Sequence, residues 1–241
     1  MKHVVSSPNP PRLVEQGRLS LHQIPAWTDN LVWLLVDEAS GEAAAVDGPE
    51  AGPVLAYCER LGLNLTTIFN THTHPDHVGI NSELQKQGRL QEMRVVGPRK
   101  AASDVPGITQ MVGEGDLIDF AGVECEVWLT EGHLNGHISF VFQEVLFCGD
   151  TMFGAGCGYL FDGPPASMQR SLARYATLPD DTWVCCGHEY TEDNLRFAWS
   201  LEPNNVALKA RIEETWALRA EGKSSIPTRV GVERATNPFL R

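Results

Sequence analysis

Apolar residues form two patterns along the chain: short continuous or alternating runs, and repeats at helical spacing. These patterns predict its strands and helices. Short apolar runs bounded by turn residues are typical of strands. They occur at residues 19–24, 31–36, 43–46, 66–69, 93–96, 117–120, 123–129, 138–142, 145–148 and 183–186. Apolar residues at helical spacing predict helices over residues 54–61, from 78 onward, around 168–176 and around 208–216. Gly62 stands where it can end the first helix.

Three segments show neither pattern. Residues 1–17 are rich in serine and proline and predict a loose N-terminal arm without helix or strand. Residues 107–115 predict a loop, and residues 226–241 predict an irregular tail. The other elements fall into two loosely similar halves, followed by helices alone. This order predicts an α/β protein built around two stacked sheets.

The composition narrows the possible partners. A chain of 241 residues suits one large domain or one domain with a small appendage. A net charge of −12 argues against binding to nucleic acid or to an anionic membrane. No apolar run approaches the ~20 residues of a membrane-spanning helix. No signal-peptide core is visible, and the basic residues near the start lack the helical stripe of an organelle presequence.

The cysteines indicate a reducing compartment. The six cysteines form no CxxC pair, and the adjacent Cys185 and Cys186 cannot easily bridge each other. We expect small buried residues rather than disulfides, and therefore a cytoplasmic protein. We also expect a monomer.

The richest chemistry lies directly after the predicted strand at residues 66–69. There the sequence reads His72-Thr73-His74-Pro75-Asp76-His77. The carboxyl ends of strands are where α/β sheets place their sites. Pro75 prevents one regular helix across this turn, so the residues on its two sides can face neighbouring sites. A solvated loop or a metal-storage tract is the alternative interpretation.

Other predicted strands end in the same residue types, which favours a metal centre. We expect one ion on His72, His74 and His133. A second ion would take Asp76, His77 and His188, with Asp150 bridging the two. This arrangement leaves open positions for a shared water, as a catalytic site requires. Zinc is the expected ion, and the mixed nitrogen and oxygen ligands also suit iron or manganese. We expect His137 to support the site rather than bind metal.

These motifs resemble the metallo-β-lactamase superfamily. The shared features are HxHxDH at residues 72–77, GHxxGH at 132–137, the strand end Gly149-Asp150 and the later His188. Narrower motifs are similar to the glyoxalase II, or hydroxyacylglutathione hydrolase, family. They read IPAWTDN at 24–30, CGDTMFGAGCG at 148–158, CGHEYT at 186–191 and NPFLR at 237–241. The similarity runs from about residue 19 to the last residue.

The resemblance implies a four-layer αββα sandwich with a small C-terminal helical domain. After the arm at residues 1–17, a metal-binding domain would span residues 18–165. Residues 166–241 would complete the sandwich with the His188 loop and add a helical region that covers the substrate.

The resemblance also implies a reaction, the hydrolysis of the thioester S-D-lactoylglutathione to glutathione and a 2-hydroxy acid, as in methylglyoxal detoxification. A hydroxide shared by two metal ions would attack the carbonyl carbon. A thiol with a pKa near ~8.5 leaves with little help from a general acid. Asp76 and Asp150 would act as catalytic residues that hold and tune the metals.

At the expected substrate contacts, some residues match the family and others differ from it. Tyr190 matches a tyrosine that contacts the glutathione backbone, and Arg241 matches a basic residue of the C-terminal segment. Tyr159 stands where the family usually has lysine or arginine, and Glu131 where proline is common. Three alternatives therefore stay open: a related thioesterase that prefers another thiol, a persulfide dioxygenase with one iron, and a non-catalytic metal-loaded module.

Overall fold

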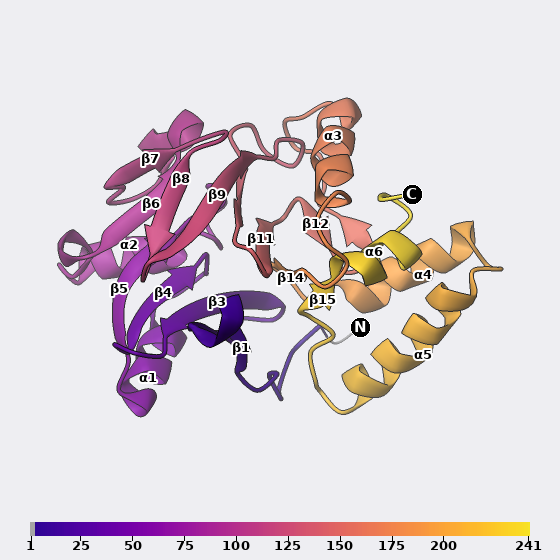
Figure 1. Cartoon of the computed structure of the whole chain (residues 1–241), viewed down its shortest axis with the longest axis horizontal. Helices are drawn as coiled ribbons and strands as arrows, with labels where there is room; N and C mark the ends of the chain where they lie inside the picture. Colours follow the sequence, from indigo (N-terminus) through magenta and orange to yellow (C-terminus); the bar gives the residue numbers. More distant parts are fainter. Residues whose placement is uncertain (1–2) are drawn as a thin grey trace.

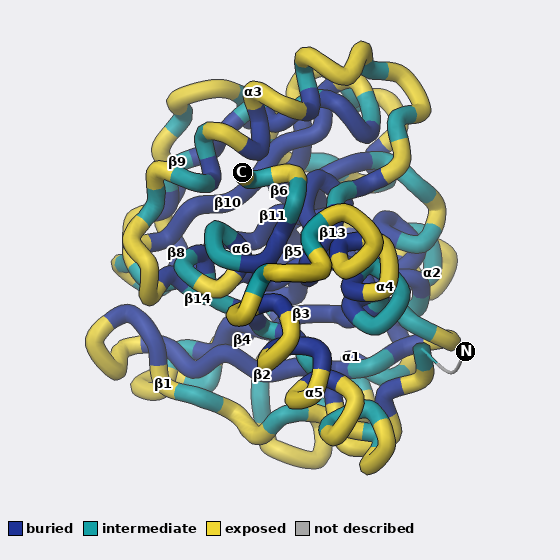
Figure 2. Tube along the Cα trace, turned by 90° about the vertical axis from the view of Figure 1, so that its right-hand side faces the viewer, coloured by how far each residue is buried: buried dark blue, intermediate teal, exposed yellow. Residues whose placement is uncertain are grey.

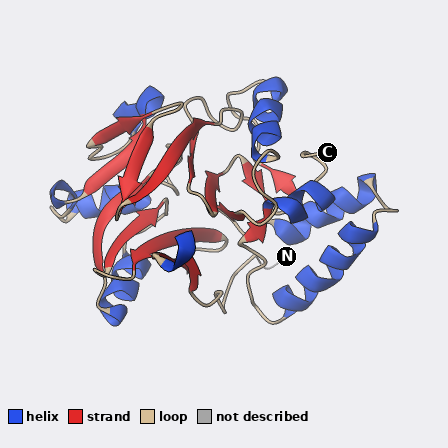
Figure 3. Cartoon of the chain, viewed as in Figure 1, coloured by secondary structure: helices blue, strands red, loops and turns tan. Residues whose placement is uncertain are grey.

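The computed structural model describes residues 3–241, and its centre is a pair of facing β-sheets (Figure 1). The first sheet has the strand order β1-β2-β3-β4-β5-β6-β7, and the second has the order β15-β14-β11-β10-β9-β8. Helices lie on the outer flanks of the sheets and at one end of the sandwich (Figure 3). This arrangement confirms the predicted αββα architecture with an added helical region.

The first sheet is antiparallel at one end and parallel at the other. The pairs from β1 to β4 are antiparallel, whereas β4, β5, β6 and β7 pair in parallel. Its strands are β1 (Arg12–Val14), β2 (Leu19–Ala26), β3 (Asn30–Asp37), β4 (Glu42–Val46), β5 (Asn64–Phe69), β6 (Arg94–Pro98) and β7 (Gln110–Val112).

The second sheet is antiparallel except where β11 pairs with β14. Its strands are β8 (Leu117–Phe120), β9 (Val123–Leu129), β10 (Ile138–Val141), β11 (Val145–Gly149), β14 (Trp183–Cys186) and β15 (Thr228–Arg229). A separate small hairpin consists of β12 (Met152–Phe153) and β13 (Gly156–Cys157).

Six helices within residues 3–241 surround the sandwich, and α4, α5 and α6 lie together at one end of it (Figure 1). The helices are α1 (Gly52–Leu61), α2 (Gly79–Lys86), α3 (Pro165–Tyr175), α4 (Thr191–Leu201), α5 (Val206–Ala220) and α6 (Val230–Thr236), with short 3₁₀ turns at Glu15–Gly17, Leu90–Glu92 and Arg99–Asp104. Gly62 ends α1 in the left-handed conformation, as predicted. No helix among residues 3–241 is both long and apolar enough to cross a bilayer.

The continuous apolar run of β3 follows from burial on both of its faces. Leu31, Trp33 and Leu35 join the core between the two sheets. Val32, Leu34 and Val36 join a second core beneath α1 and α2. The traces of the central strands are accordingly buried in Figure 2, whereas α5 is largely exposed.

The segments without periodicity differ from their predictions. Within residues 107–115, Gln110–Val112 forms β7, an edge strand too short to show a pattern. Within the tail, Thr228–Arg229 forms β15 and Val230–Thr236 forms α6. The α6 sequence contains glycine and β-branched residues that disfavour a helix, so tertiary contacts override local preference there.

The N-terminal segment also differs from the expected loose arm. Arg12–Val14 pairs with β2, and Glu15–Gly17 forms a 3₁₀ turn. Val5 is buried in the core between the sheets. Residues 1 and 2 of the predicted arm lie outside the described residues. The division of the remaining chain at residue 165 stays a prediction.

Candidate metal centre

All seven predicted ligands come from loops at the ends of central strands. The His72–His77 stretch follows β5 and leads to α2, and His133 lies between β9 and β10. Asp150 directly follows β11, and His188 follows β14 two residues after its end. Because these strands come from both sheets, the loops meet over one edge of the sandwich.

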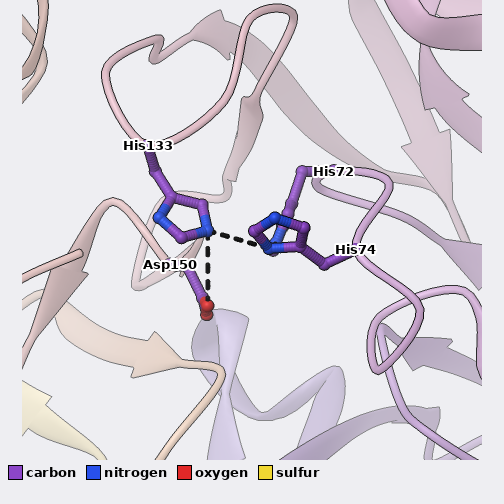
Figure 4. A group of neighbouring side chains, drawn as sticks. All are labelled: His72, His74, His133 and Asp150. Carbon is purple, nitrogen blue, oxygen red and sulfur yellow. Dashed lines mark hydrogen bonds and ion pairs between the residues drawn. The ribbon is translucent and has the colours of Figure 1, made fainter. Parts of the chain in front are cut away.

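The first group of candidate ligands is shown in Figure 4, where His72 and His74 face His133 and Asp150. The Nδ1 atom of His74 lies 3.2 Å from Nε2 of His72 and 3.0 Å from Nε2 of His133. One ligand atom from each of the four residues lies within 4.8 Å of the others. The structure thus brings together the three residues predicted for the first position, with Asp150 beside them.

The second group contains Asp76, His77 and His188, whose ligand atoms also lie within 4.8 Å of one another. Nε2 of His188 is 3.4 Å from Oδ2 of Asp76 and 3.4 Å from Nε2 of His77. Both groups are largely buried, since His72, His77, His133 and His188 are each at most 4 % exposed.

Asp150 lies between the two groups. Its Oδ1 is 3.3 Å from Nε2 of His77, whereas its Oδ2 is 3.4 Å from His188 and 3.7 Å from His133. Oδ1 is buried, yet it has no hydrogen-bond partner among the described residues. An unpartnered buried carboxylate oxygen is costly. A cation held between Oδ1 and the facing nitrogens would remove this cost, so the residues fit a metal ion.

The protonation of the histidines also indicates that these residues can bind metal ions. Burial lowers the pKa values of His72, His74 and His133, so these rings are neutral and offer lone pairs. Burial also acts to lower the pKa of His77, but Asp150 and Asp47 raise it to about 10. The pKa of His188 is likewise raised, against the effect of burial, chiefly by Asp150. A bound cation would take the place of these protons.

Two carboxylates outside the ligand groups orient the histidines of the second group. Asp47 lies 3.0 Å from Nδ1 of His77 and accepts hydrogen bonds from the amide and hydroxyl of Thr71 at 2.8 and 2.7 Å. Asp29 lies 2.8 Å from Nδ1 of His188. Such carboxylate partners fix ring orientation and make the ligand nitrogen more basic. Sequence analysis missed both, although Asp47 directly follows the strand predicted at residues 43–46.

The first group is supported by neutral atoms instead. Nδ1 of His133 donates to the backbone carbonyl of Tyr159 at 2.7 Å, and Nδ1 of His72 is 3.0 Å from the Thr71 hydroxyl. His137 accepts a hydrogen bond from the amide of Asp150 at 3.2 Å and stacks on His72 with 4.8 Å between ring centres. These contacts agree with the supporting role expected for His137.

Two of the three predicted substrate contacts lie at the rim of the site. Tyr159 is 73 % exposed, and its ring lies 4.9 Å from that of Phe161, which stands edge-on to His74. Tyr190 stacks on His188 with 4.8 Å between ring centres. Arg241 contacts the Ala235 carbonyl at 2.8 Å and Glu202 at 3.2 Å, and its predicted contact with the substrate stays a prediction.

An αββα sandwich with histidine and aspartate loops at one edge defines a class, the metallo-β-lactamase superfamily. The superfamily's model matches residues 32–188. The crystal structure of BLEG-1 B3 metallo-β-lactamase has the same fold: it aligns with this structure with a TM-score of 0.66 at 20 % identity. The alignment covers 91 % of this chain and 99 % of that one.

A narrower match covers the C-terminal part of the chain. The model described as "Hydroxyacylglutathione hydrolase C-terminus" matches residues 189–241. A hydroxyacylglutathione hydrolase of Synechococcus sp. is 46 % identical over 226 residues, covering 90 % of this chain and 87 % of that protein. One of Rhizobium meliloti is 45 % identical over 216 residues, covering 89 % and 83 %. The chain belongs to the hydroxyacylglutathione hydrolase family, which confirms the resemblance found in the sequence.

Proposed function

We propose that this protein hydrolyses the thioester of a 2-hydroxyacylglutathione, with S-D-lactoylglutathione as the expected substrate, to glutathione and a 2-hydroxy acid. The observation that carries the proposal is the position of Asp150 between two complete ligand groups. The relatives named hydroxyacylglutathione hydrolase, which share 46 % and 45 % of aligned residues with this chain, support the substrate class.

The chain's own residues would hold two divalent cations. His72, His74 and His133 would bind the first ion, and Asp76, His77 and His188 the second, with Asp150 shared between them. When bound, two such ions lower the pKa of a water between them and polarise the thioester carbonyl. Three imidazoles at the first position suit zinc, and the two carboxylates at the second also suit iron or manganese.

Asp76 and Asp150 would act as catalytic residues, because they are the two carboxylates among the proposed ligands and would hold and tune the bound ions. Asp150 is 6 % exposed, so its charge is little screened by solvent. Asp76 is fixed by a hydrogen bond from the amide of Asn30 at 3.1 Å. The leaving thiolate needs no strong acid, because free thiols have a pKa near ~8.5.

The test compares wild type with Asp150→Asn. Wild type is expected to bind about two divalent ions per chain, measured by elemental analysis, and to hydrolyse S-D-lactoylglutathione. Asp150→Asn keeps the side-chain volume but removes the shared charge, so it should lose metal and turnover together. Asp181→Asn is the matched control, since Asp181 is exposed and remote from both groups. Full turnover with two ions in Asp150→Asn would contradict the shared role.

A second candidate is a thioesterase of the same mechanism that prefers another thiol. Tyr159 at the rim carries no charge, and Arg241 is paired with Glu202, so this site offers fewer free cations to anionic glutathione. Kinetics with an acyl-coenzyme A alongside S-D-lactoylglutathione separate the two. Preference for the coenzyme A ester would replace the glutathione assignment. A persulfide dioxygenase with one iron is disfavoured because the second ligand group is complete.

The proposal also includes the compartment and the oligomeric state of the protein, which we expect to be a cytoplasmic monomer. All six cysteines are free, and five of them are buried, which supports a protein of the reducing cytosol. We expect a monomer, and size-exclusion chromatography with light scattering at micromolar concentration would measure its mass against the 26.5 kDa of one chain.

A further inference from the structure

The N-terminal segment is fastened along the C-terminal part of the chain. The amides of Ser6 and Ser7 both donate to the Gly222 carbonyl at 3.0 Å. Further along, the Asn9 side chain donates to the Ile226 carbonyl at 2.7 Å. With Val5 buried in the core, these contacts fix the path of the segment and bring its first described residue, His3, to the start of α4.

His3 makes three contacts at the start of α4. Its Nδ1 atom lies 3.0 Å from the backbone carbonyl of Glu189, and its Nε2 atom lies 3.0 Å from a carboxylate oxygen of Asp193. Its ring stands edge-on to the ring of Tyr190, with 5.5 Å between centres and 85° between planes. Glu189 precedes Tyr190 and Asp193 follows three residues later, so His3 spans the turn that carries Tyr190.

The other neighbours of Tyr190 belong to the metal centre. Its ring lies parallel to that of His188, 4.8 Å away, and its hydroxyl donates to Asp29 at 3.3 Å. The ring of Phe153 stands edge-on to it at 5.2 Å. Among these contacts, His3 is the one that comes from the N-terminal segment.

We propose that His3 is a positioning residue for Tyr190, holding the Glu189–Asp193 turn so that the tyrosine ring stays beside His188 and ready to contact the glutathione part of the substrate. The proposal rests on the proposed function, because Tyr190 is expected to contact glutathione. A side chain held in its bound conformation loses less freedom on binding, so preorganisation improves affinity. His3 thus affects substrate binding without touching substrate or metal.

The first test is kinetic and uses the full chain. In His3→Ala, KM for S-D-lactoylglutathione is expected to rise about 3- to 10-fold, the range that one unrestrained side chain costs. The turnover number kcat and the metal content should stay unchanged. Val4→Ala is the matched control, because the Val4 side chain is 45 % exposed and only its carbonyl is used, by Arg219.

Partial rescue separates the two hydrogen bonds. Asparagine places an amide donor near the position of Nδ1, and glutamine places one near Nε2. His3→Asn is therefore expected to keep the bond to Glu189, and His3→Gln the bond to Asp193, each with a smaller rise in KM than His3→Ala. In a Tyr190→Ala background, His3→Ala should have no further effect on KM, because the two residues act as one unit.

Amide hydrogen exchange measures how firmly His3 holds the Tyr190 turn, and it needs no substrate. Amides of residues 189–194 should exchange faster in His3→Ala than in wild type, and at the wild-type rate in Val4→Ala. Equal exchange in His3→Ala and wild type, or a fall in kcat at constant KM, would overturn the proposal. If wild type failed to cleave the glutathione thioester, the proposed function would fail, while exchange would still decide whether His3 holds the Tyr190 turn.

Discussion

At the scale of single residues, the candidate centre depends on side chains that never face the substrate. Asp47 lies 3.0 Å from the outer nitrogen of His77, and Asp29 lies 2.8 Å from the outer nitrogen of His188. Both histidines belong to the second group. The first group has neutral hydrogen-bond partners in the same positions. The second position is thus the more anionic one, and its metal affinity should respond more strongly to changes outside the ligands.

We expect Asp47→Asn to weaken metal binding at the second position by about 10- to 100-fold, the usual effect of losing such a partner. Asparagine keeps an oxygen for Thr71 but removes the charge beside His77. Titration against a competing chelator measures the affinity. Asp119→Asn, an exposed change on β8, is the control, and equal affinity in the two variants would speak against this role.

A second prediction concerns Gly187, which leaves no room for a side chain. A Cβ there would lie 2.6 Å from Oδ1 of Asp150 and 2.6 Å from Cε1 of His77. Gly187→Ala should therefore push these groups apart and lower metal content and activity at least 10-fold while circular dichroism stays native. Gly52→Ala is the matched control, because a Cβ at Gly52 meets nothing within 4 Å. Normal metal content in Gly187→Ala would show that the site can relax.

At the scale of elements, short segments near the end of the chain depend on buried polar contacts. Glu233 of α6 is fully buried, and it pairs with Arg211 of α5 at 2.5 Å and accepts from the Ala155 amide at 2.8 Å. These bonds tie α6 to both α5 and the β12–β13 hairpin. They explain how a seven-residue helix with poor local preference forms.

We expect Glu233→Gln to lower the free energy of unfolding by about 3–5 kcal/mol, because it leaves the buried charge of Arg211 without a negatively charged partner. Urea denaturation followed by circular dichroism measures the change. The double variant Arg211→Met with Glu233→Leu removes both charges and should recover most of the loss. A double variant no more stable than Glu233→Gln would argue that the remaining hydrogen bonds, not the ion pair, hold α6.

At the scale of the whole molecule, the candidate centre lies where the two sheets meet, so its ligands link parts of the chain that are distant in sequence. The loop after β5 of the first sheet meets the loops after β9, β11 and β14 of the second sheet at the sandwich edge. A ligand that binds only the folded state stabilises it by mass action. Metal should therefore stabilise the whole fold and not only the loops.

Removing metal with a chelator should lower the melting temperature by about 10 °C or more. One site filled at a thousand times its Kd contributes about 4 kcal/mol, and in a chain of this size each kcal/mol shifts Tm by about 2–4 °C. Calorimetry with and without chelator measures the shift, and added zinc should reverse it. Asp150→Asn should respond much less, and an equal response in that variant would place the stabilising metal elsewhere.

The sequence by itself determined the features that rest on local pattern. The doubly buried run of β3, the strand-end loops with His72–His77, and the glycine that ends α1 are each readable over a few residues. Strand ends gather at sheet edges in α/β folds, so the sequence alone predicts that these ligands lie together.

Contacts between residues far apart in the chain became visible in the folded protein alone. His3 and Tyr190 are separated by most of the sequence, as are Asp29 and His188, so no local period relates them. The helix α6 and the edge strand β7 form through partners supplied elsewhere. Arg241 was expected beside the substrate, but its pairing with Glu202 depends on how the last residues fold back. Burial and partner geometry settle such contacts, and a pattern along one chain contains neither.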